Sequence, residues 1–347
     1  MAKVYFLNNC FPTHNNPAIG TYAKTIADAI EDAGYDLKLI VLYRGNHKLL
    51  DYFKFYCRLI SFTIPTKDVV LYINHYTTLI PLIIRMLFTH RKMVIHWHGE
   101  ELIRNGWVYK ILRYLIKKTF RSNTVHIAPS NYYKGVVIEK LNVPADKVIV
   151  SPSGGVNLNI FKERTFPCIN QLHIGFPAAL NEHKGVKYLR LVIDNIPSID
   201  LALGKKTYIH IIRFGENCSE FIDNIPMEFR DRIIIEEQYK KEEVAHFYDR
   251  VHLSLFFSKR ESLGLTVLES MACGVPVIAR SNTSMLELVE SGLSGELIPD
   301  EPSINDIKQA IIDIVTNITS YKPREKAKEY SYDKVVSQYR TFLRTFN

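Results

Sequence analysis

The chain has 347 residues, more than one ordinary domain of roughly 100 to 200 residues, and this length predicts two domains. With 47% hydrophobic and 23% charged residues it is globular, and its longest apolar tract, residues 77–88, contains Arg85 and is shorter than the roughly 20 residues that cross a bilayer. The net charge of +8 divides into +11 for residues 1–166 and −3 for the rest, which favours an anionic partner for the first half, such as nucleic acid, phospholipid headgroups or a phosphorylated substrate.

The N-terminal segment MAKVYFLNNC has one lysine and an apolar stretch too short for a signal peptide. We therefore expect the protein to stay in the cytoplasm. The five cysteines are widely scattered and form no CxxC pair, so we expect reduced thiols with neither a disulfide framework nor a zinc site.

Short, near-continuous apolar runs in the first half are typical of strands in a parallel sheet that is buried on both faces. They cover residues 4–8, 37–43, 69–73, 93–97, 125–130 and 148–153. Amphipathic helical patterns alternate with them. In residues 21–36 one helical face is formed by Ala23, Ile26, Ala27 and Ile30, and Gly34 ends the pattern.

Residues 107–121 predict a helix with one cationic and one apolar face. At 100° per residue the four cations fall within about 80°, opposite the apolar residues. The cations are Lys110, Arg113, Lys117 and Arg121, and the apolar residues are Val108, Ile111, Leu112, Leu115 and Ile116. We expect the apolar face to pack on the sheet. The cationic face is then either merely solvated or membrane-facing, in contact with anionic lipid.

The strand pattern restarts after the irregular residues 161–171. The new runs cover residues 172–178, 208–215, 232–237, 251–258 and 276–280. The alternation of strands and helices predicts an α/β fold with an N-terminal domain over 1–165 and a C-terminal domain over 166–329. A C-terminal helix over about 330–347 can cross back onto the first domain. We expect two doubly wound domains facing a central cleft, with ligands bound beyond the carboxyl ends of the strands.

Nucleotide-binding motifs narrow the chemistry. A dinucleotide fold would show G-x-G-x-x-G after the first strand, but the segment that follows it has one glycine, Gly20. No G-x-x-x-x-G-K-[ST] motif occurs, which excludes a P-loop enzyme in its usual form.

The segment 251–280 predicts a strand, a turn, a helix over about 263–272 and a second strand. Glu261 then lies at the carboxyl end of a strand, and Glu269 lies about two helical turns further on. Gly264 lies at the helix start, where backbone N–H groups bind anions. This arrangement suits a nucleotide-sugar, and the alternative is that both glutamates are solvated. The small residues around Glu269 favour a semi-buried carboxylate that needs hydrogen-bond partners.

The E-x7-E block followed by SMACGVPVIA resembles the signature of the family 4 retaining glycosyltransferases of the GT-B fold, which have two Rossmann-like domains. The similarity extends along the chain through IGTYAKTIADAIEDAGYDLKLI, VIHWHGEE, IAPSNYYK, SPSGGVNLNIF and NEHKGVKYL. It implies an N-terminal acceptor-binding domain and a C-terminal nucleotide-sugar donor-binding domain.

The resemblance also implies roles for single residues. Glu261 would contact the donor sugar, and His98 would lie near the anomeric centre, so these two are the catalytic candidates. The implied donor-binding residues are the ribose ligand Glu269, the diphosphate lysine Lys184, the loop glycine Gly20 and the peptide N–H groups of Leu263, Gly264 and Leu265.

Three positions depart from the family pattern. An arginine five or six residues before the lysine is replaced by Ala179 and Ala178, with Arg213 and Arg280 as candidate substitutes. Leu263 replaces the usual phenylalanine, and a double glycine is reduced to Gly20.

The resemblance predicts a retaining transferase that uses a nucleotide-sugar, with a UDP-sugar slightly favoured over a GDP-sugar, and needs no cofactor. The acceptor would be a lipid-linked glycan in bacterial-type surface polysaccharide biosynthesis (capsule, O-antigen or other lipopolysaccharide), and the enzyme would bind peripherally to the inner face of the cell membrane. The alternative is a non-catalytic nucleotide-sugar or glycan-binding relative. A nucleic-acid binder is the outside alternative, and no helix-turn-helix, RNP-like or zinc-finger pattern supports it.

Metal chemistry remains a competing interpretation. His96, His98 and Glu100 would share one side of an extended strand. No H-E-x-x-H and no D-x-D motif occurs, and we therefore expect no metal site and metal-independent transfer, with Lys184 and a helix N-terminus in place of the metal ion.

Overall fold

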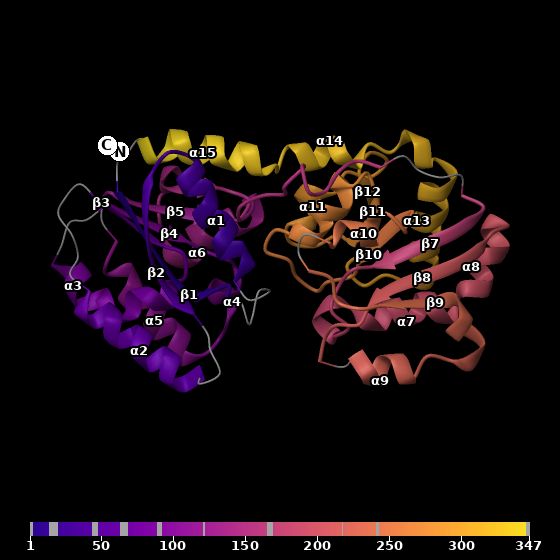
Figure 1. The fold of residues 1–347 in the computed structure, drawn as a ribbon, viewed down its shortest axis with the longest axis horizontal. Coiled ribbons are helices and arrows are strands. Elements are labelled where there is room, and N and C mark those ends of the chain that lie inside the picture. Colours follow the sequence, from indigo (N-terminus) through magenta and orange to yellow (C-terminus); the bar gives the residue numbers. More distant parts are fainter. Residues whose placement is uncertain are drawn as a thin grey trace. The chain divides into compact units, whose positions relative to one another are not determined.

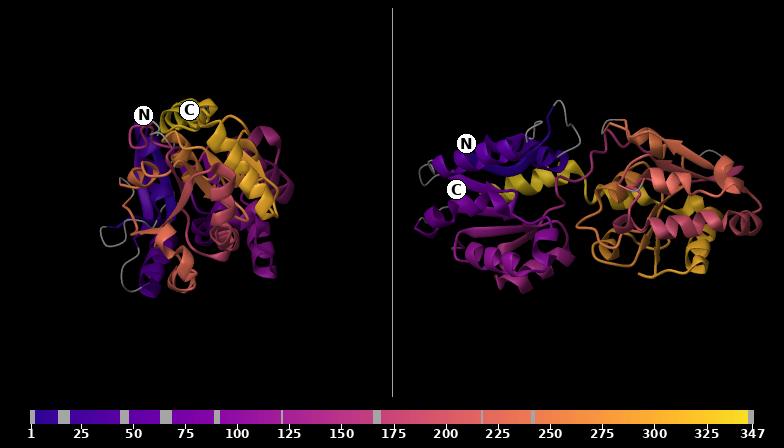
Figure 2. Two further views of the ribbon diagram at one scale, coloured as in Figure 1. Left: turned by 90° about the vertical axis from the view of Figure 1, so that its right-hand side faces the viewer. Right: turned by 90° about the horizontal axis from the view of Figure 1, so that it is seen from below.

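The computed structural model describes residues 3–13, 20–43, 48–62, 69–88, 92–120, 122–164, 169–216, 218–240 and 243–344. The chain divides into two compact units, residues 1–155 with 332–347 (unit 1) and residues 156–331 (unit 2). Each unit has a parallel six-stranded sheet between helices (Figures 1 and 2), so the predicted two-domain α/β fold is confirmed. None of the helices in the described ranges has both the length and the apolar content that a membrane crossing requires.

The sheet of unit 1 has the strand order β2-β1-β3-β4-β5-β6, and every neighbouring pair is parallel. The strands are β1 (Lys3–Phe11), β2 (Asp36–Tyr43), β3 (Val69–Ile73), β4 (Lys92–His96), β5 (Thr124–Ala128) and β6 (Val148–Val150). All five residues of β3 are buried, as expected for an apolar strand covered on both faces. The chain starts at β1, moves to the edge at β2 and returns to β3, so the order reverses between β1 and β3.

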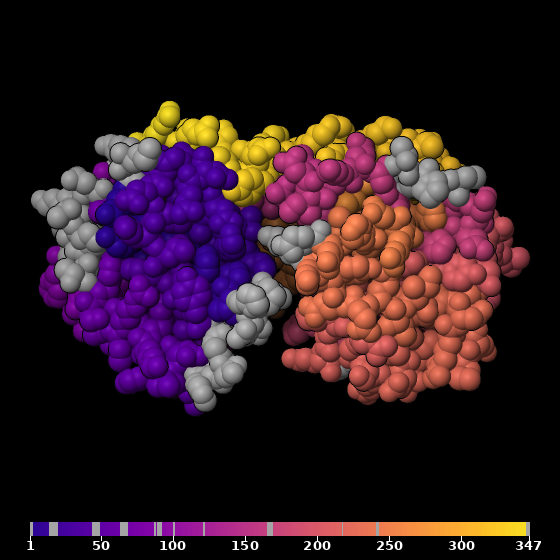
Figure 3. Space-filling view, in the orientation of Figure 1, coloured from indigo at the N-terminus to yellow at the C-terminus, as the bar shows by residue number. Residues whose placement is uncertain are grey.

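Helices cover both faces of this sheet. They are α1 (Thr21–Asp32), α2 (Lys48–Ser61), η1 (Tyr76–Leu82), α3 (Ile83–Leu87), α4 (Glu100–Ile103), α5 (Trp107–Lys117), α6 (Asn131–Leu141), η2 (Ala145–Lys147) and α15 (Tyr332–Arg344). One apolar cluster joins α1 and α15 to the sheet, and the other joins α2, η1, α3, α5 and α6 to it. The C-terminal α15 lies against the N-terminal part of the chain in Figure 3, and Tyr72 and Tyr339 share a hydrogen bond of 2.7 Å.

The sheet of unit 2 has the order β12-β11-β10-β7-β8-β9, again with parallel pairs. The strands are β7 (Gln171–Phe176), β8 (Lys206–Ile212), β9 (Ile233–Glu236), β10 (Leu253–Phe256), β11 (Val277–Arg280) and β12 (Gly295–Ile298). The chain runs from β7 out to β9 and returns to β10, on the other side of β7. The order therefore reverses between β7 and β10.

The helices of unit 2 also cover both faces of its sheet. They are η3 (Glu182–Lys184), α7 (Val186–Asp194), α8 (Ile196–Leu203), α9 (Cys218–Asp223), η4 (Met227–Arg232), α10 (Ala245–Tyr248), α11 (Leu265–Ala272), α12 (Met285–Leu288), α13 (Ile304–Thr316), η5 (Ile318–Ser320) and α14 (Pro323–Lys328). The cores on the two faces are built around α7 and α13 and around α11 and α12.

The boundary between the units differs from the predicted position at 165. The chain enters unit 2 at Val156, whose backbone N–H donates to the carbonyl of Tyr330 at 2.9 Å. Phe161 is buried in the core of unit 2, with its ring 6.4 Å from that of Tyr248. These contacts place residues 156–164 in unit 2, which the apolar pattern of the strands alone did not indicate.

The prediction that the apolar face of residues 107–121 packs on the sheet is wrong for most of that face. Of its members, only Ile116 is buried, and Leu112 is partly buried against the same core. The apolar residues Val108, Ile111 and Leu115 are 45%, 48% and 38% exposed. The helix ends at Lys117, and Arg121 lies outside the described residues.

The cationic face of this helix is also smaller than predicted. The Arg113 side chain donates to the carbonyls of Glu101 and Arg104 at 3.3 and 3.1 Å, and is therefore held against the protein. Lys110 is exposed and Lys117 is half-buried.

Candidate functional site

The carboxyl ends of β7 and β10 meet where the strand order of unit 2 reverses, and ligands of open α/β sheets bind at such a point. Lys184 follows β7 and Glu261 follows β10. Their side chains form an ion pair with 2.5 Å between Nζ and Oε1. Lys184 is 33% and Glu261 21% exposed, so both remain accessible. The structure brings together two predicted site residues that lie 77 positions apart in sequence.

The backbone around Lys184 explains how the two segments approach. Asn181 caps η3, accepting through its side chain from the N–H of Lys184 at 3.0 Å. Gly185 has φ +75°, and a Cβ there would lie 2.2 Å from the carbonyl oxygen of Phe257 at the end of β10. Glycine is therefore required at this point. The N–H of Lys259 donates to the carbonyl of His183 at 2.9 Å, which aligns residues 257–261 with η3.

The backbone of Glu261 is held by the segment that follows β11. Its N–H donates to Thr283 Oγ1 at 3.2 Å, and its carbonyl accepts from Ser284 Oγ at 3.0 Å. Thr283 has φ +41°, a left-handed conformation that is unfavourable for a β-branched residue. Backbone strain of this kind is often found at functional sites, and here it positions the residue that fixes Glu261.

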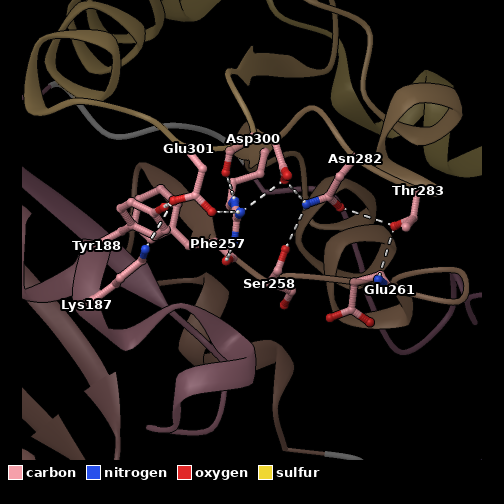
Figure 4. A network of polar contacts seen from close by, with 10 residues as sticks. Lys187, Tyr188, Phe257, Ser258, Glu261, Asn282, Thr283, Asp300 and Glu301 are labelled. Carbon is pink, nitrogen blue, oxygen red and sulfur yellow. Dashed lines mark hydrogen bonds and ion pairs between the residues drawn. The ribbon is translucent and has the colours of Figure 1, made fainter. Parts of the chain in front are cut away.

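Figure 4 shows that this segment continues into a polar network. Asn282 donates through Nδ2 to the carbonyl of Ser258 at 3.1 Å and to Asp300 Oδ1 at 2.6 Å. Because Asn282 lies beside Thr283, the network connects the loops after β10, β11 and β12. It fixes the backbone that carries Glu261.

Arg280 belongs to this network and is not available as a phosphate ligand. Its side chain is 2% exposed, and its three guanidinium nitrogens contact Phe257, Asp300 and Glu301. Its guanidinium carbon also lies 5.2 Å from the ring centre of Tyr188. The suggestion that Arg280 replaces the missing arginine is therefore wrong.

Arg213 remains a candidate for that role. It follows β8, is 49% exposed and pairs with Glu237 at 3.1 Å. The next residue, Phe214, accepts through its carbonyl from the N–H of Leu180 at 2.7 Å. This bond places the segment of Arg213 beside Ala179, where the arginine is missing.

The start of α11 follows Glu261 directly. Its first N–H groups have no partner within the helix, as at every helix start. Of the three residues predicted to bind phosphate, Leu265 is the first residue of the helix, Gly264 is its N-cap and Leu263 precedes the cap. Gly264 has φ +100°, and a Cβ there would lie 2.6 Å from Met285 Cε. The missing side chain therefore permits close packing on α12. The Leu263 side chain is buried in the same core.

Glu269 lies in α11 and is half-buried, as expected from the small residues around it. Its charge adds to the effect of burial in raising the pKa of the Tyr248 hydroxyl. Burial, with smaller contributions from Asp249 and Glu269, raises the pKa of the Cys273 thiol to about 12.

Unit 1 has a second polar cluster where its own strand order reverses, between β1 and β3. Asn74, after β3, donates through Nδ2 to Asn8 Oδ1 of β1 at 3.2 Å. Gly20 begins α1 with φ +78°, and a Cβ there would lie 3.0 Å from the carbonyl oxygen of Cys10. Gly20 thus allows α1 to start close to the end of β1.

His98 follows β4 in the same cluster. Its Nε2 lies 2.7 Å from the carbonyl oxygen of Asn74. Because a carbonyl only accepts, Nε2 carries the hydrogen and Nδ1 keeps a lone pair. Burial lowers the pKa of His98 to about 4, against a smaller opposing effect of the Asn74 hydrogen bond, so the ring is neutral at neutral pH. The ring of Tyr22, in α1, lies 4.8 Å from that of His98 in an edge contact.

The rings of His96 and His98 are stacked, with centroids 4.6 Å apart and an interplanar angle of 21°. This arrangement differs from imidazoles that converge on one metal ion. Among the residues that the structure describes, no group of three His, Cys, Asp or Glu side chains could hold a metal ion.

Sequence reasoning missed Asn181, Asn282, Thr283 and Ser284, which hold the two charged residues in place. Each follows a strand of unit 2 at its carboxyl end, in the segments LNEHK and RSNTS. Polar residues in the loops that follow buried strands were the available signal.

Comparison with known proteins agrees with this geometry. Residues 169–334 match the family model described as glycosyl transferases group 1. A probable sucrose-phosphate synthase of Thermosipho melanesiensis is 26% identical over 211 residues, which cover 56% of this chain and 44% of that protein. For the next two curated relatives the match spans 60% and 32% of their length, so the chain corresponds to only part of each of these relatives.

Solved structures match along nearly the whole chain. Anabaena Alr3699/HepE, in complex with UDP, aligns with a TM-score of 0.71 at 16% identity and covers 99% of this chain and 100% of its own. Its complex with UDP-glucose gives a TM-score of 0.72. The lipopolysaccharide outer core galactosyltransferase WaaB aligns with a TM-score of 0.66 at 15% identity, over 97% of this chain and 98% of its own. At these identities the likeness concerns the fold, and the predicted GT-B fold is confirmed.

Proposed function

We propose that the chain transfers a sugar from a nucleotide-sugar donor to a glycan acceptor, because residues 169–334 match the family model of the group 1 glycosyl transferases. The observation that carries the proposal is the Lys184–Glu261 ion pair beside the start of α11. An ammonium group and the N–H groups of a helix start suit a diphosphate, and a carboxylate suits sugar hydroxyls.

The proposed donor is a UDP-sugar, with a GDP-sugar as the second choice. The support is the likeness of the fold to HepE, which was solved with UDP and with UDP-glucose. Glu261 would accept hydrogen bonds from the sugar and Glu269 from the ribose. His98, with its neutral ring in unit 1, would contribute the lone pair of Nδ1 to a hydroxyl near the anomeric centre.

Transfer breaks the bond between the anomeric carbon and a diphosphate oxygen, and the leaving diphosphate takes the electron pair. In our proposal Lys184 and the start of α11 stabilise the charge that develops on this oxygen, so the reaction needs no metal ion. The acceptor hydroxyl forms the new bond to the anomeric carbon and gives up its proton to the oxygen of the leaving diphosphate. The proposed product keeps the anomeric configuration of the donor.

The proposed acceptor is a lipid-linked glycan of a bacterial surface polysaccharide, such as capsule or lipopolysaccharide. The name of WaaB, whose fold is similar, supports this class of acceptor. The work would take place at the cytoplasmic face of the cell membrane, to which the enzyme would bind peripherally.

The test is a thermal-shift panel of UDP-, GDP- and ADP-sugars, followed by an assay for nucleoside diphosphate release with lipid-linked acceptors. A ligand at 100 times its dissociation constant adds about 2.7 kcal/mol to the free energy of unfolding, so a specific donor should raise the melting temperature by several degrees. The Lys184→Met variant should lose this shift. A shift without turnover on any acceptor would favour the non-catalytic relative, and the absence of any shift would overturn the proposal.

A further inference from the structure

The outer face of α2 is apolar although nothing in the described chain covers it. The helix packs on the sheet through Phe55 and Leu59, which are buried. A second apolar stripe points outward, within an arc of about 100° at 100° per residue. It consists of Leu49, Leu50, Phe53 and Ile60, with exposed fractions of 88%, 47%, 67% and 55%, and the exposed thiol of Cys57.

The helix α5 repeats this arrangement. Its outward apolar stripe covers an arc of about 120°. The stripe consists of Trp107, Val108, Ile111, Tyr114 and Leu115, and Trp107 is 74% exposed. The short α3 adds Ile84, and Phe88 follows at its end, with exposed fractions of 74% and 82%. Of the seventeen large hydrophobic side chains exposed among the described residues, ten lie on these three helices and an eleventh, Phe88, directly follows α3, so the clustering is not a scatter of single residues.

The three helices belong to one face of unit 1. All of them pack against η1 and share its apolar cluster with the sheet. The side chain of Arg85 in α3 donates to the carbonyl of Phe62, directly after α2, at 2.6 Å. In Figure 1, α2 and α5 lie on one side of the sheet of unit 1, and α15 lies on the other.

Charge indicates what covers this face. Together α2, α3 and α5 contain seven Lys or Arg and one acidic residue, Asp51. Lys54, Arg58 and Lys110 are exposed beside the apolar stripes, as is Lys118 directly after α5. An apolar face flanked by cations is typical of helices that lie in the interface of an anionic membrane. A second copy of the chain fits less well, because a twofold interface would oppose the same cations.

We propose that α2, α3 and α5 form a membrane-docking face. The exposed apolar side chains enter the interfacial region of an anionic bilayer, and Lys54, Arg58, Lys110 and Lys118 contact the lipid headgroups. This assignment replaces the cationic face predicted from the sequence, since it places the apolar stripe of α5 in the lipid. It gives a surface to the peripheral membrane binding that forms part of the proposed function, and it does not depend on sugar transfer.

Cys57 gives a direct probe of this face. The other described cysteines, Cys10, Cys218 and Cys273, are buried, so an environment-sensitive fluorophore should label Cys57. A Cys57→Ser variant measures any label elsewhere. With vesicles that contain a third of anionic phosphatidylglycerol we expect a several-fold rise in emission, a blue shift and co-sedimentation. Binding should weaken as salt rises, because the Debye length shortens from about 10 Å at 0.1 M to about 3 Å at 1 M.

Matched variants separate the docking face from the rest of the surface. Phe53→Ser with Trp107→Ser should weaken vesicle binding at least tenfold, and Lys54→Glu with Lys110→Glu should abolish it. Leu201→Ser with Met227→Ser replaces residues of unit 2 that are more exposed than Phe53 and Trp107, at 87% and 77%, and should leave vesicle binding unchanged. Unchanged donor-induced thermal shifts in all variants show that the fold is intact.

Three outcomes would overturn the proposal. The first is that the wild type stays in the supernatant with vesicles at low salt. The second is that the unit 2 variant loses vesicle binding as much as the unit 1 variants do. The third is that Cys57 is shielded from the fluorophore in a dimer when no vesicles are present. Vesicle binding by a protein that shows no donor shift would leave the docking face in place and overturn the proposed function. A donor shift without vesicle binding would leave the proposed sugar transfer in place, and it would overturn the docking face together with the proposed peripheral membrane binding.

Discussion

The polar clusters of the two units occupy the same topological position, at the point where each strand order reverses, but they differ in charge. In unit 2 the cluster is ionic, with the Lys184–Glu261 pair at its centre and Arg280 behind it. In unit 1 the histidine is neutral: His98 is bonded to the carbonyl of Asn74, and burial lowers the pKa of its ring to about 4. A carboxylate lies beside it without an ion pair to His98, since Glu101 Oε1 accepts from the backbone N–H of His98 at 2.5 Å. One architecture thus supports two kinds of site, since the side chains after the strands decide the chemistry.

The difference fits a division of tasks between the units. Charged groups suit a diphosphate, whose charge grows as it leaves, whereas neutral hydrogen-bonding groups suit sugar hydroxyls. The ionic cluster also needs a rigid support, which the loops after β11 and β12 supply through Asn282 and Thr283.

Replacement of Glu261 by alanine should break the ionic cluster with the largest effect. Loss of one positioned, charged contact costs about 2 to 4 kcal/mol in the transition state, which corresponds to a rate about 30- to 900-fold lower. The melting temperature should change little, because the Glu261 backbone, and not its side chain, is bonded to Thr283 and Ser284. Steady-state kinetics with the identified donor and acceptor provide the measurement. Glu325→Ala, an exposed glutamate of α14, is the control, and wild-type rates for Glu261→Ala would refute the assignment.

The neutral state of a buried imidazole in unit 1 can be tested through His126, which is 1% exposed. Burial lowers its pKa to about 4, and its Nδ1 accepts from Trp97 Nε1 at 3.1 Å, which a proton on Nδ1 would prevent. Since the unfolded histidine takes up its proton near pH 6.5, the stability is complete above that pH and falls as the pH drops toward 4. The loss is on the order of 3 kcal/mol at most for this residue.

Thermal unfolding between pH 7 and 4 measures this effect. His126→Gln keeps an acceptor for Trp97 and should flatten the decline. His246→Gln, at an exposed position of unit 2, should not change it. Equal slopes for the wild type and His126→Gln would show that His126 is not held neutral by burial.

The fold could be predicted from the sequence further than the site could. Eleven of the twelve strands in the described residues were predicted, because each is a compact apolar run between polar or turn residues. The exception, β12, has only four residues, two of them half-buried, and includes Glu296. Helical periodicity found the apolar arc of α5, but it could not show which way the arc faces, because an outward apolar face and a buried one have the same pattern.

The site residues that carry charge were named through family resemblance, whereas those that hold them were not. Thr283 positions Glu261 through a left-handed backbone that its residue type disfavours. The surrounding loops impose this conformation, whereas the local preference of threonine predicts a negative φ at this position. The prediction that Arg280 binds phosphate failed for a similar reason. The side chain of an arginine at a strand end points either toward a ligand or into the protein, and the packing around it, which the sequence does not show, determines which.

A double-mutant cycle on Lys184 and Glu261 sharpens the description of the ionic cluster. Lys184→Met should raise the donor KM and lower kcat, because a charge beside the diphosphate is lost. If the 2.5 Å pair acts as a unit, the effects on kcat/KM should fall short of additivity by about 1 to 2 kcal/mol, within the range for residues in contact. Lys187→Met, an exposed neighbour that pairs with Glu301, is the matched control. Full additivity would mean that the pair separates when donor binds.

The smallest expected effect is that of metal removal. The sequence has no D-x-D motif, and Lys184 with the start of α11 would supply the positive potential that a divalent cation supplies in other sugar transferases. Transfer in excess EDTA should therefore stay within about twofold of the untreated rate, a change of less than about 0.5 kcal/mol. Prior dialysis against a chelating resin controls for carried-over metal, and Glu261→Ala in the same buffers measures the background. Activity that EDTA abolishes and Mn²⁺ restores would mean that the positive charge of unit 2 is insufficient, and that the leaving diphosphate reaches the site with its own cation.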